Sequence, residues 1–335
     1  MGRVVVDLYP RQSGVPLEDV ETFGRYLGGS PTNVAVAAAR LGRRAAVVTR
    51  TGDDPFGRFV RKALRRYGVD DRYVTSVPGL PTPLSFCEIF PPDDFPLYFY
   101  RYPKAPDLEI HEHELDFAAI AEARLLWATV TGLSEEPSRT ATLAALKAHR
   151  EASGRADRAA PGQAHGRARG GMTVLDLDWR PMLWKDPSRA RPAIHEALEH
   201  ATVAVGNREE CEIATGERDP RAAARALLAR GLDLVVVKRG PDGVLAMTPD
   251  TVAEVRPVRI EVVNGLGAGD AFGGALCHGL LAGWDLPRVL AFANAAGAIV
   301  ASRLSCAEAM PTEAEVNDLL HHQSRVPVPS IEKQP

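Results

Sequence analysis

The chain alternates between short apolar runs and longer stretches in which hydrophobic residues recur with helical spacing. Apolar runs rich in Val, Leu and Ala predict buried strands at residues 45–49, 125–130, 173–176, 202–205 and 234–237. Ala-rich amphipathic stretches predict helices at residues 33–41, 140–149 and 219–230. Apolar strands joined by helices are typical of a mostly parallel sheet covered on both faces. We therefore expect an α/β fold with a Rossmann-like three-layer core, which binds ligands at the carboxyl ends of its strands.

Residues 83–103 interrupt this alternation and hold seven of the chain's Phe and Tyr residues, of which there are 10 Phe and 7 Tyr in all. Within residues 97–102, the two-residue period of a strand places Tyr98, Tyr100 and Tyr102 on one face. One interpretation is a hairpin packed on the core. The other is a ribbon whose aromatic face needs a ligand or a partner to cover it.

A second interruption, residues 151–171, is rich in Ala, Gly and Arg. Because this composition cannot bury a core, we predict a disordered surface insertion without chemistry, and nucleic-acid binding by its arginines is a weaker alternative. The remaining length suits one domain over residues 1–320, followed by a polar tail at 321–335.

Composition and charge exclude several classes of function. A hydrophobic fraction of 45% and a charged fraction of 25% are ordinary for a globular protein, and a net charge of −3 gives no reason to expect nucleic acid or an anionic membrane as partner. The chain has no apolar run of membrane-spanning length and no signal peptide, so we expect a cytoplasmic protein. The four cysteines are scattered without a Cys-x-x-Cys pair, which indicates reduced thiols rather than disulfides or a zinc site.

The most informative stretch is residues 264–275, Asn-Gly-Leu-Gly-Ala-Gly-Asp-Ala-Phe-Gly-Gly-Ala. Gly267, Ala268 and Gly269 stand directly before Asp270 and open a helix of small residues. Small residues let the backbone approach a ligand, and the free N–H groups of a helix start bind anions. A carboxylate beside such a cradle suits phosphoryl transfer to an alcohol, since it accepts the hydroxyl proton while the amides stabilise the moving phosphoryl group. The alternative is that Asp270 caps the helix, which would stabilise it by about 1 kcal/mol but would not explain the small residues.

This stretch resembles the second signature of the PfkB/ribokinase-type sugar kinases, and residues 28–35 (Gly-Gly-Ser-Pro-Thr-Asn-Val-Ala), followed by Gly42 and Gly52, resemble the first. Two motifs in the family's order, more than 200 residues apart, are far more specific than either one alone. Gly265 and Cys277 depart from the second signature, but the acid of the signature, Asp270, is retained. The chain contains no G-x-x-x-x-G-K-S/T motif, which argues against a P-loop kinase.

The resemblance implies a ribokinase-like fold with a small β-lid formed by about residues 9–28 and 83–110. It also implies ATP and Mg²⁺ as cofactors, leaves a requirement for a monovalent cation open, and suggests a homodimer that forms through the lid. The family's first strand normally begins several residues before Gly2, so the resemblance predicts a misplaced start site.

Several residues are implied to bind the sugar. Asp7 follows the apolar run at residues 4–6 and could accept hydrogen bonds from sugar hydroxyls, or cap a turn. Gly28, Gly29 and Asn33 belong to the first signature, in which glycines admit the sugar and the Asn amide contacts a hydroxyl. A helix N-cap is the structural alternative for Asn33.

Two further motifs are implied to bind the nucleotide and its metal. Asn207 and Glu210 match the family's Asn-x-x-Glu motif, which organises Mg²⁺ and its waters near the phosphates, and oxygen ligands suit this hard cation. The turn after the Val-rich run at 234–237, if it is more than a hairpin, is implied to contact ATP. The residues expected to bind ATP are Lys238, Gly240 and Gly243 in this turn, together with Asn207 and with Asn294 in a later helix.

Three segments narrow the substrate. Residues 176–180 resemble the Asp-x-Asn-x-Arg stretch of family members that act on keto-deoxy sugar acids, in which Arg180 could pair with a carboxylate or serve as a structural ion pair. The lid segment supplies two further cations, Arg101 and Lys104. The lid segment, together with residues 205–212 and 305–312, is similar to family members that phosphorylate the C6 hydroxyl of a sugar acid from myo-inositol breakdown.

Other functions stay open at this point. Within the family, 2-keto-3-deoxygluconate or fructose is the alternative substrate, and a nucleotide- or sugar-binding regulator without catalysis is a more remote alternative. A dinucleotide-dependent dehydrogenase does not fit, because no Gly-x-Gly-x-x-Gly motif opens a helix near the first strand. The expected partners are therefore a small sugar acid and ATP.

Overall fold

The computed structural model describes residues 1–159 and 171–325, and it contains two principal sheets and ten α-helices within those ranges. The strands are β1 (Val5–Pro10), β2 (Phe23–Gly28), β3 (Thr49–Gly52), β4 (Val74–Val77), β5 (Leu84–Cys87), β6 (Leu97–Tyr100), β7 (Leu125–Thr129), β8 (Met172–Asp176), β9 (Val203–Asn207), β10 (Leu234–Lys238), β11 (Val244–Met247) and β12 (Val252–Val255). The helices are α1 (Ser30–Arg40), α2 (Pro55–Arg66), α3 (Phe117–Glu122), α4 (Ser138–Ala159), α5 (Ala190–Leu198), α6 (Arg208–Thr215), α7 (Pro220–Leu228), α8 (Ala268–Ala282), α9 (Leu286–Ala301) and α10 (Glu313–Arg325).

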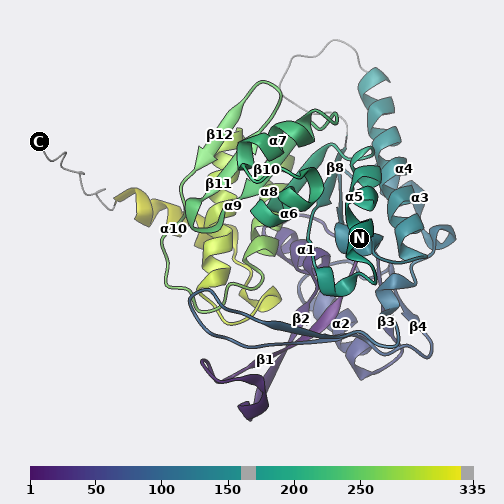
Figure 1. Ribbon diagram of the computed structural model, residues 1–335, viewed down its shortest axis with the longest axis vertical. Coiled ribbons are helices and arrows are strands. Elements are labelled where there is room, and N and C mark those ends of the chain that lie inside the picture. The colour runs from purple at the N-terminus through teal and green to yellow at the C-terminus, as the bar shows by residue number, and fades with distance from the viewer. Residues whose placement is uncertain (160–170, 326–335) are drawn as a thin grey trace, which may run out of the picture.

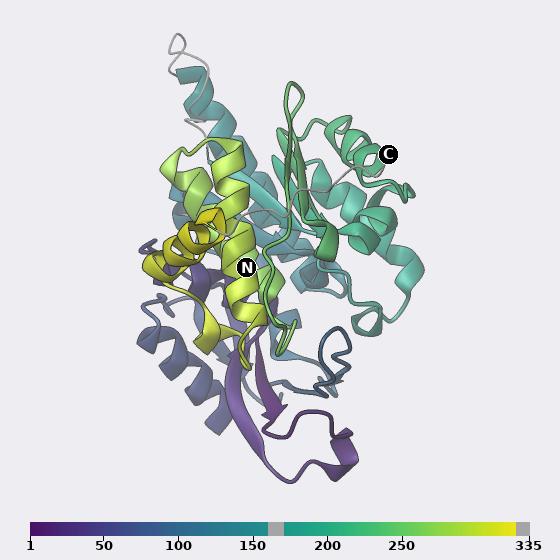
Figure 2. The ribbon, with the colours of Figure 1, turned by 90° about the vertical axis from the view of Figure 1, so that its left-hand side faces the viewer.

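The central sheet has six strands in the order β12-β11-β10-β9-β8-β7. Strands β7 to β10 are parallel, and β11 and β12 continue the sheet as antiparallel strands. Successive residues of each strand face opposite layers, because side chains alternate across a sheet. In β7, for example, Leu126 and Ala128 pack with helices α4 to α7, whereas Trp127 packs with α1, α8 and α9. Figures 1 and 2 show these two helical layers on either side of the sheet, which confirms the predicted three-layer α/β fold.

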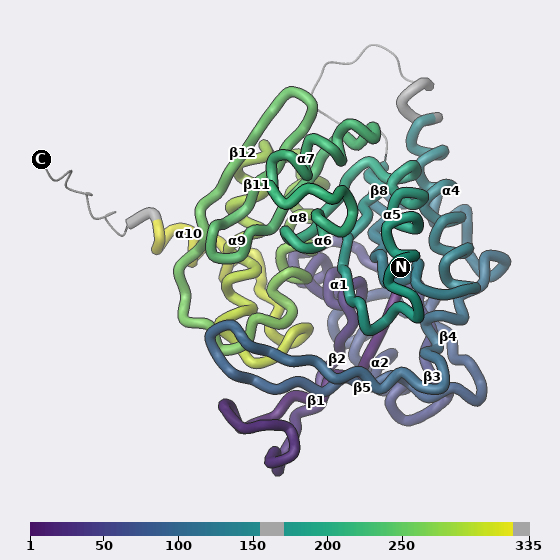
Figure 3. The backbone as a smooth tube through the Cα atoms, in the orientation of Figure 1, coloured from purple at the N-terminus to yellow at the C-terminus, as the bar shows by residue number. Residues whose placement is uncertain are grey.

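A second sheet lies below the first in Figure 1 and has the order β2-β1-β5-β6. It joins segments that are far apart in the sequence, since β1 pairs with β2 on one side and with β5 on the other. The tube in Figure 3 follows β5 across the lower edge of the molecule beside β1 and β2. Movement of this sheet as a lid, and a homodimer formed through it, stay predictions.

The aromatic ribbon alternates as predicted. Tyr98, Tyr100 and Tyr102 are 42%, 60% and 83% exposed, whereas Leu97 and Phe99 line the cavity described below. The ribbon is therefore an edge strand, β6, with an outer face of tyrosines and an inner face that belongs to the cavity.

The first residues of the chain connect the sheets. The amino group of Met1 donates a hydrogen bond to the carbonyl oxygen of Trp127 over 2.7 Å. The N–H of Gly2 donates one to the carbonyl oxygen of Val48 over 3.2 Å. Residues 1–3 thus run between β7 and the segment before β3, and they continue directly into β1.

Three predicted boundaries were wrong. The strand expected at 45–49 is β3 (Thr49–Gly52), because its parallel partner β4 begins opposite Thr49 and Ala46 makes only an isolated bridge to Asp70. Residues 151–159, predicted as disordered, extend helix α4, since Ala, Glu and Arg propagate a helix that is already packed. The predicted tail begins later than expected, because α10 runs to Arg325.

Residues 160–170 and 326–335 lie outside the described residues. Within the described ranges, no helix is long and apolar enough to cross a membrane.

Candidate active site

A cavity of about 1720 Å³ lies between the β2-β1-β5-β6 sheet, the carboxyl ends of β8 to β10 and the start of α8. The carboxyl ends of parallel strands are where ligands bind in open α/β sheets. Most of the residues predicted to bind a ligand line this cavity, namely Asp7, Gly29, Asn33, Arg180, Asn207, Glu210, Lys238, Gly240, Gly243, Gly267, Ala268, Gly269, Asp270 and Asn294.

The start of α8 forms one wall, and Gly267 is its N-cap with φ of +80°. A side chain is excluded at this position, because a Cβ atom on Gly267 would lie 2.6 Å from Sγ of Cys306. The preceding turn is held by Asn264, whose Oδ1 accepts a hydrogen bond from the N–H of Leu266 over 3.0 Å. The small-residue motif therefore presents the free N–H groups of a helix start to the cavity, as an anion site requires.

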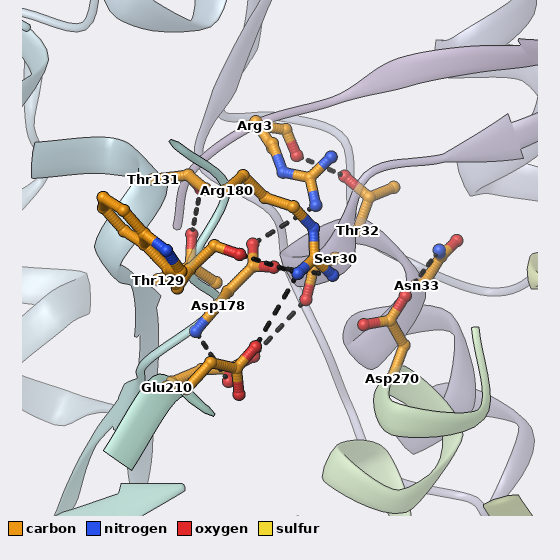
Figure 4. Close-up of polar contacts among 12 residues, drawn as sticks. Arg3, Ser30, Thr32, Asn33, Thr129, Thr131, Asp178, Arg180, Glu210 and Asp270 are labelled. Carbon is orange, nitrogen blue, oxygen red and sulfur yellow. Dashed lines mark hydrogen bonds and ion pairs between the residues drawn. The ribbon is translucent and has the colours of Figure 1, made fainter. Parts of the chain in front are cut away.

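Asp270 occupies the first turn of α8 but does not cap it, because Gly267 is the N-cap. Its Oδ2 accepts a hydrogen bond from Nδ2 of Asn33 over 2.8 Å, which joins the two signatures across the cavity (Figure 4). Burial raises the pKa of Asp270, and the hydrogen bonds from Asn33 and Ser30 oppose this rise. The site thus contains a carboxylate more basic than usual, beside an anion cradle.

Asp7 lies in the middle of β1, with its side chain toward the cavity. Burial raises the pKa of Asp7 to about 7, against the hydrogen bond donated by the Tyr9 hydroxyl to Oδ2 over 2.9 Å. Gly28 on the neighbouring strand accommodates this carboxyl group, since a Cβ atom there would lie 2.2 Å from Asp7 Oδ2. The glycine of the first signature therefore makes room for the acid on β1.

A cluster of charged side chains follows β8. Asp178 accepts contacts from two guanidinium groups, with Oδ2 at 3.2 Å from Arg3 Nη2 and Oδ1 at 3.3 Å from Arg180 Nη2 (Figure 4). Burial would raise the pKa of Asp178, but these two cations outweigh it and lower the pKa. Arg180 also lies 3.7 Å from Glu210, measured from Nη1 to Oε1. Burial raises the pKa of the nearby Asp176 to about 7.

Asn207 and Glu210 form a capping box at the start of α6. Oδ1 of Asn207 accepts from the N–H of Glu210 over 2.8 Å, and Oε2 of Glu210 accepts from the N–H of Asn207 over 2.6 Å. Nζ of Lys238, at the end of the next strand, lies 4.0 Å from Glu210 Oε2. Burial disfavours the charge of Lys238, but the surrounding carboxylates of Glu210 and Asp176 outweigh it and raise its pKa.

This donor set is compatible with a nucleotide and its Mg²⁺. Lys238 and the α8 amides suit phosphate oxygens, and the Asn207 and Glu210 side chains supply oxygen atoms close by. Over residues 1–159 and 171–325, no group of three or more His, Cys, Asp or Glu side chains could hold a metal. Mg²⁺ would therefore take most of its ligands from phosphates and water, as it commonly does.

Arg101 and Lys104 do not line the cavity. Arg101 donates two hydrogen bonds to the carboxylate of Asp107, which is buried and also accepts from the N–H of Val4 over 3.0 Å. Lys104 lies 2.6 Å from the carboxylate of Glu109, measured from Nζ to Oε1. Both cations are engaged within or beside their own segment, so the structure does not bring them to the predicted sugar site.

The cavity wall also contains residues that the sequence analysis did not assign to the site, including Arg3, Tyr9, Ser85 and Cys306. One signal was available for Arg3, a charged residue placed directly before the apolar run at residues 4–6. Ser85 is a buried polar residue on β5, and its hydroxyl has no hydrogen-bond partner within the described residues. The neighbours of Tyr9 and Cys306 in the cavity are set only by folding.

Comparison with known proteins agrees with this geometry. Residues 1–313 match the pfkB family of carbohydrate kinases. The chain belongs to this family. It is therefore a carbohydrate kinase, a phosphotransferase with an alcohol group as acceptor.

Individual relatives refine the comparison. The chain is 32% identical over 328 residues to a 5-dehydro-2-deoxygluconokinase of Geobacillus kaustophilus (strain HTA426), covering 96% of this chain and 92% of the relative. Among solved structures, it resembles a fructokinase of Vibrio cholerae O395 in its fructose-, ADP- and calcium-bound form, with a TM-score of 0.81, 26% identity and coverage of 95% and 97%. A fructokinase of Xylella fastidiosa with bound ATP gives a TM-score of 0.82 at 25% identity, covering 97% and 98%.

Proposed function

We propose that the chain uses ATP and Mg²⁺ to phosphorylate the C6 hydroxyl of 5-dehydro-2-deoxy-D-gluconate, a step of myo-inositol catabolism. The observation that carries the proposal is a buried Asp270 at the small-residue start of α8, in a cavity whose wall also contains the guanidinium groups of Arg3 and Arg180. The buried carboxylate supports phosphoryl transfer, and the guanidinium groups support an acidic sugar as substrate. Curated relatives at 30% to 33% identity that carry the name 5-dehydro-2-deoxygluconokinase support the same substrate.

In this proposal Asp270 accepts the proton of the C6 hydroxyl as its oxygen attacks the γ-phosphorus of ATP. The bond between that phosphorus and the β,γ-bridging oxygen breaks, and ADP leaves. The amides of Gly267, Ala268, Gly269 and Asp270 stabilise charge on the transferred group. The raised pKa of Asp270 makes it a stronger proton acceptor at neutral pH than an ordinary carboxylate.

The remaining residues position the two substrates. Lys238 would bind phosphate oxygens, the turn with Gly240 and Gly243 and the side chain of Asn294 would contact the nucleotide, and bound Mg²⁺ would neutralise phosphate charge near Asn207 and Glu210. Asp7 and Asn33 would bind sugar hydroxyls. Oδ1 of Asn33 supports this role, because it is buried and has no hydrogen-bond partner in the described part of the chain. The β2-β1-β5-β6 sheet would cover the sugar with its inner face.

A substrate panel tests the proposal. ATP-dependent phosphorylation would be measured with 5-dehydro-2-deoxygluconate, 2-keto-3-deoxygluconate, fructose and ribose in the presence of Mg²⁺. We expect kcat/KM to be highest for the first compound. Fructose as the preferred substrate would contradict the proposed sugar acid but retain the kinase chemistry, and it is the alternative that the likeness to two fructokinases favours.

A further inference from the structure

Arg3 is a buried cation in the wall of the cavity, and it is 7% exposed. Its Nη2 contacts Asp178, its Cζ lies 5.6 Å from the centroid of the Phe99 ring, and its Nε has no hydrogen-bond partner within the described residues. The backbone around it is equally confined, since its carbonyl oxygen would lie 2.6 Å from a Cβ atom on Gly29. Burial of a guanidinium group with an unsatisfied N–H donor costs folding free energy unless a ligand or a partner compensates its charge.

Arg3 is less compensated by neighbouring charges than two other cations of the cavity wall, Arg180 and Lys238. Arg180 lies between Asp178 and Glu210, and Lys238 also pairs with Glu210. Arg3 has a single ion pair within residues 1–159 and 171–325, and it shares that partner, Asp178, with Arg180. Asp7 is close enough to interact with Arg3, but burial raises the pKa of Asp7 to about 7 and so weakens its negative charge. Arg3 therefore shares its ion-pair partner with Arg180, whereas Arg180 has Glu210 as a second partner.

The position of Arg3 also suits one end of the proposed substrate. In a six-carbon sugar acid, the C1 carboxylate and the C6 hydroxyl are at opposite ends of the carbon chain. Figure 4 shows Arg3 above Arg180 and apart from Asp270 on its helix, and Arg3 is still near enough to oppose the rise in the pKa of Asp270. Arg180, in contrast, shares Glu210 with Lys238 at the nucleotide end.

From this placement we propose that Arg3 binds the carboxylate of the sugar acid, with Asp178 holding its guanidinium in position. The inference rests on the proposed function, because only an acidic substrate needs such a cation. It replaces Arg101 and Lys104, which lie outside the cavity, with a residue of the chain's first strand region. Guanidinium groups recognise carboxylates better than ammonium groups do, because their planar donors match the two oxygens.

The test is steady-state kinetics on Arg3→Gln, with 5-dehydro-2-deoxygluconate and with its neutral counterpart carrying a C1 alcohol. We expect the KM for the acid to rise roughly 10- to 100-fold, because the variant loses a hydrogen bond between charged groups. The kcat and the KM for the neutral compound should change little. Lys104→Gln is the matched control, since it removes one positive charge from the lid segment outside the cavity and should leave the KM for the acid unchanged.

Further variants separate substrate binding from folding. Arg3→Gln leaves Asp178 with one cation, so the double variant Arg3→Gln/Asp178→Asn supplies a neutral hydrogen-bonding pair, and Arg3→Lys retains the charge. Thermal unfolding and ATP titration would verify that each variant folds. We expect the double variant to keep the high KM, and Arg3→Lys to recover part of the loss.

The outcomes distinguish this inference from the proposed function. A folded Arg3→Gln or Arg3→Gln/Asp178→Asn enzyme with a wild-type KM for the acid would overturn the role of Arg3 and leave the proposed function intact. A wild-type enzyme that prefers the neutral compound would overturn both.

Discussion

The two ends of the cavity are built in different ways. At the end proposed to bind phosphate, the start of α8 and the capping box of α6 each use residues that are consecutive or nearly so, such as Gly267 to Asp270 and Asn207 to Glu210. At the proposed sugar end, Arg3 contacts both Asp178 and the ring of Phe99, and these three residues come from remote parts of the chain. The phosphate end is thus a set of local backbone structures, whereas the sugar end is assembled by tertiary packing.

This difference indicates that one end of the cavity serves the common reaction and the other end selects the substrate. A phosphoryl group is common to every reaction of the family, so a helix start can bind it through backbone amides. A particular sugar must be recognised by side chains whose positions depend on several strands. Substitutions at the phosphate end should therefore reduce turnover for every substrate, and substitutions at the sugar end should change which substrate binds.

The largest effect should come from Asp270→Asn. If Asp270 is the general base, kcat should fall roughly 10²- to 10⁴-fold while the fold and the affinity for ATP are retained, since an amide is isosteric but cannot accept the proton. Turnover and ATP titration would measure this. Asp285→Asn is the control, because Asp285 also stands at the start of a helix but only caps α9 through the N–H of Arg288. Near wild-type turnover in Asp270→Asn would reject the assignment.

A smaller loss is expected from Gly267→Ala, which tests the backbone of the phosphate end. Ala at a positive φ costs roughly 1 to 2 kcal/mol, and its Cβ would also press on Cys306. We expect lower stability and a kcat reduced by as much as roughly 10²-fold, because the helix start must shift.

Gly283→Ala is the matched control for this substitution. Gly283 has φ of +71° at the other end of the same helix, and a Cβ atom there would meet nothing within 4 Å. It should therefore lose similar stability but keep its turnover. Equal loss of turnover in both variants would show that stability, rather than the shape of the phosphate cradle, is responsible. Thermal unfolding and kcat measurements decide between these results.

The smallest effect concerns the stability of the sugar end. The pKa of Asp7 is raised from 3.8 to about 7 in the folded protein, so the free energy of unfolding falls as pH rises through this range. Asn does not titrate and can still accept the hydrogen bond from Tyr9. Asp7→Asn should therefore increase the free energy of unfolding at pH 8 by roughly 1 to 4 kcal/mol.

This gain should shrink by more than half at pH 5, because Asp7 is protonated in the folded protein and pH 5 is only about one pH unit above the unfolded pKa of 3.8. Denaturant unfolding at both values of pH would measure it. The same variant should bind the sugar more weakly. Identical pH dependence in the variant and the wild type would show that Asp7 is not destabilised by burial.

The comparison also explains which predictions succeeded. Strand alternation correctly placed Tyr98, Tyr100 and Tyr102 on one face, which the structure shows to be the outer one, because the period of a strand is a local property. The prediction of a helix start at Gly267 to Asp270 succeeded for the same reason. Residues 151–159 were misjudged because composition does not show that a helix already packed on a sheet will continue.

The sequence by itself determined the three-layer α/β fold, the family and the small-residue helix start with its acid, since each follows from short local patterns and their order along the chain. Only the tertiary structure decided which cations reach the cavity. Arg101 pairs with buried Asp107, whereas Arg3 enters the wall beside Asp178, 175 positions further along the chain. A charged residue beside an apolar run does not show which of these two arginines reaches the cavity, because their environments are created by the pairing of strands remote in sequence.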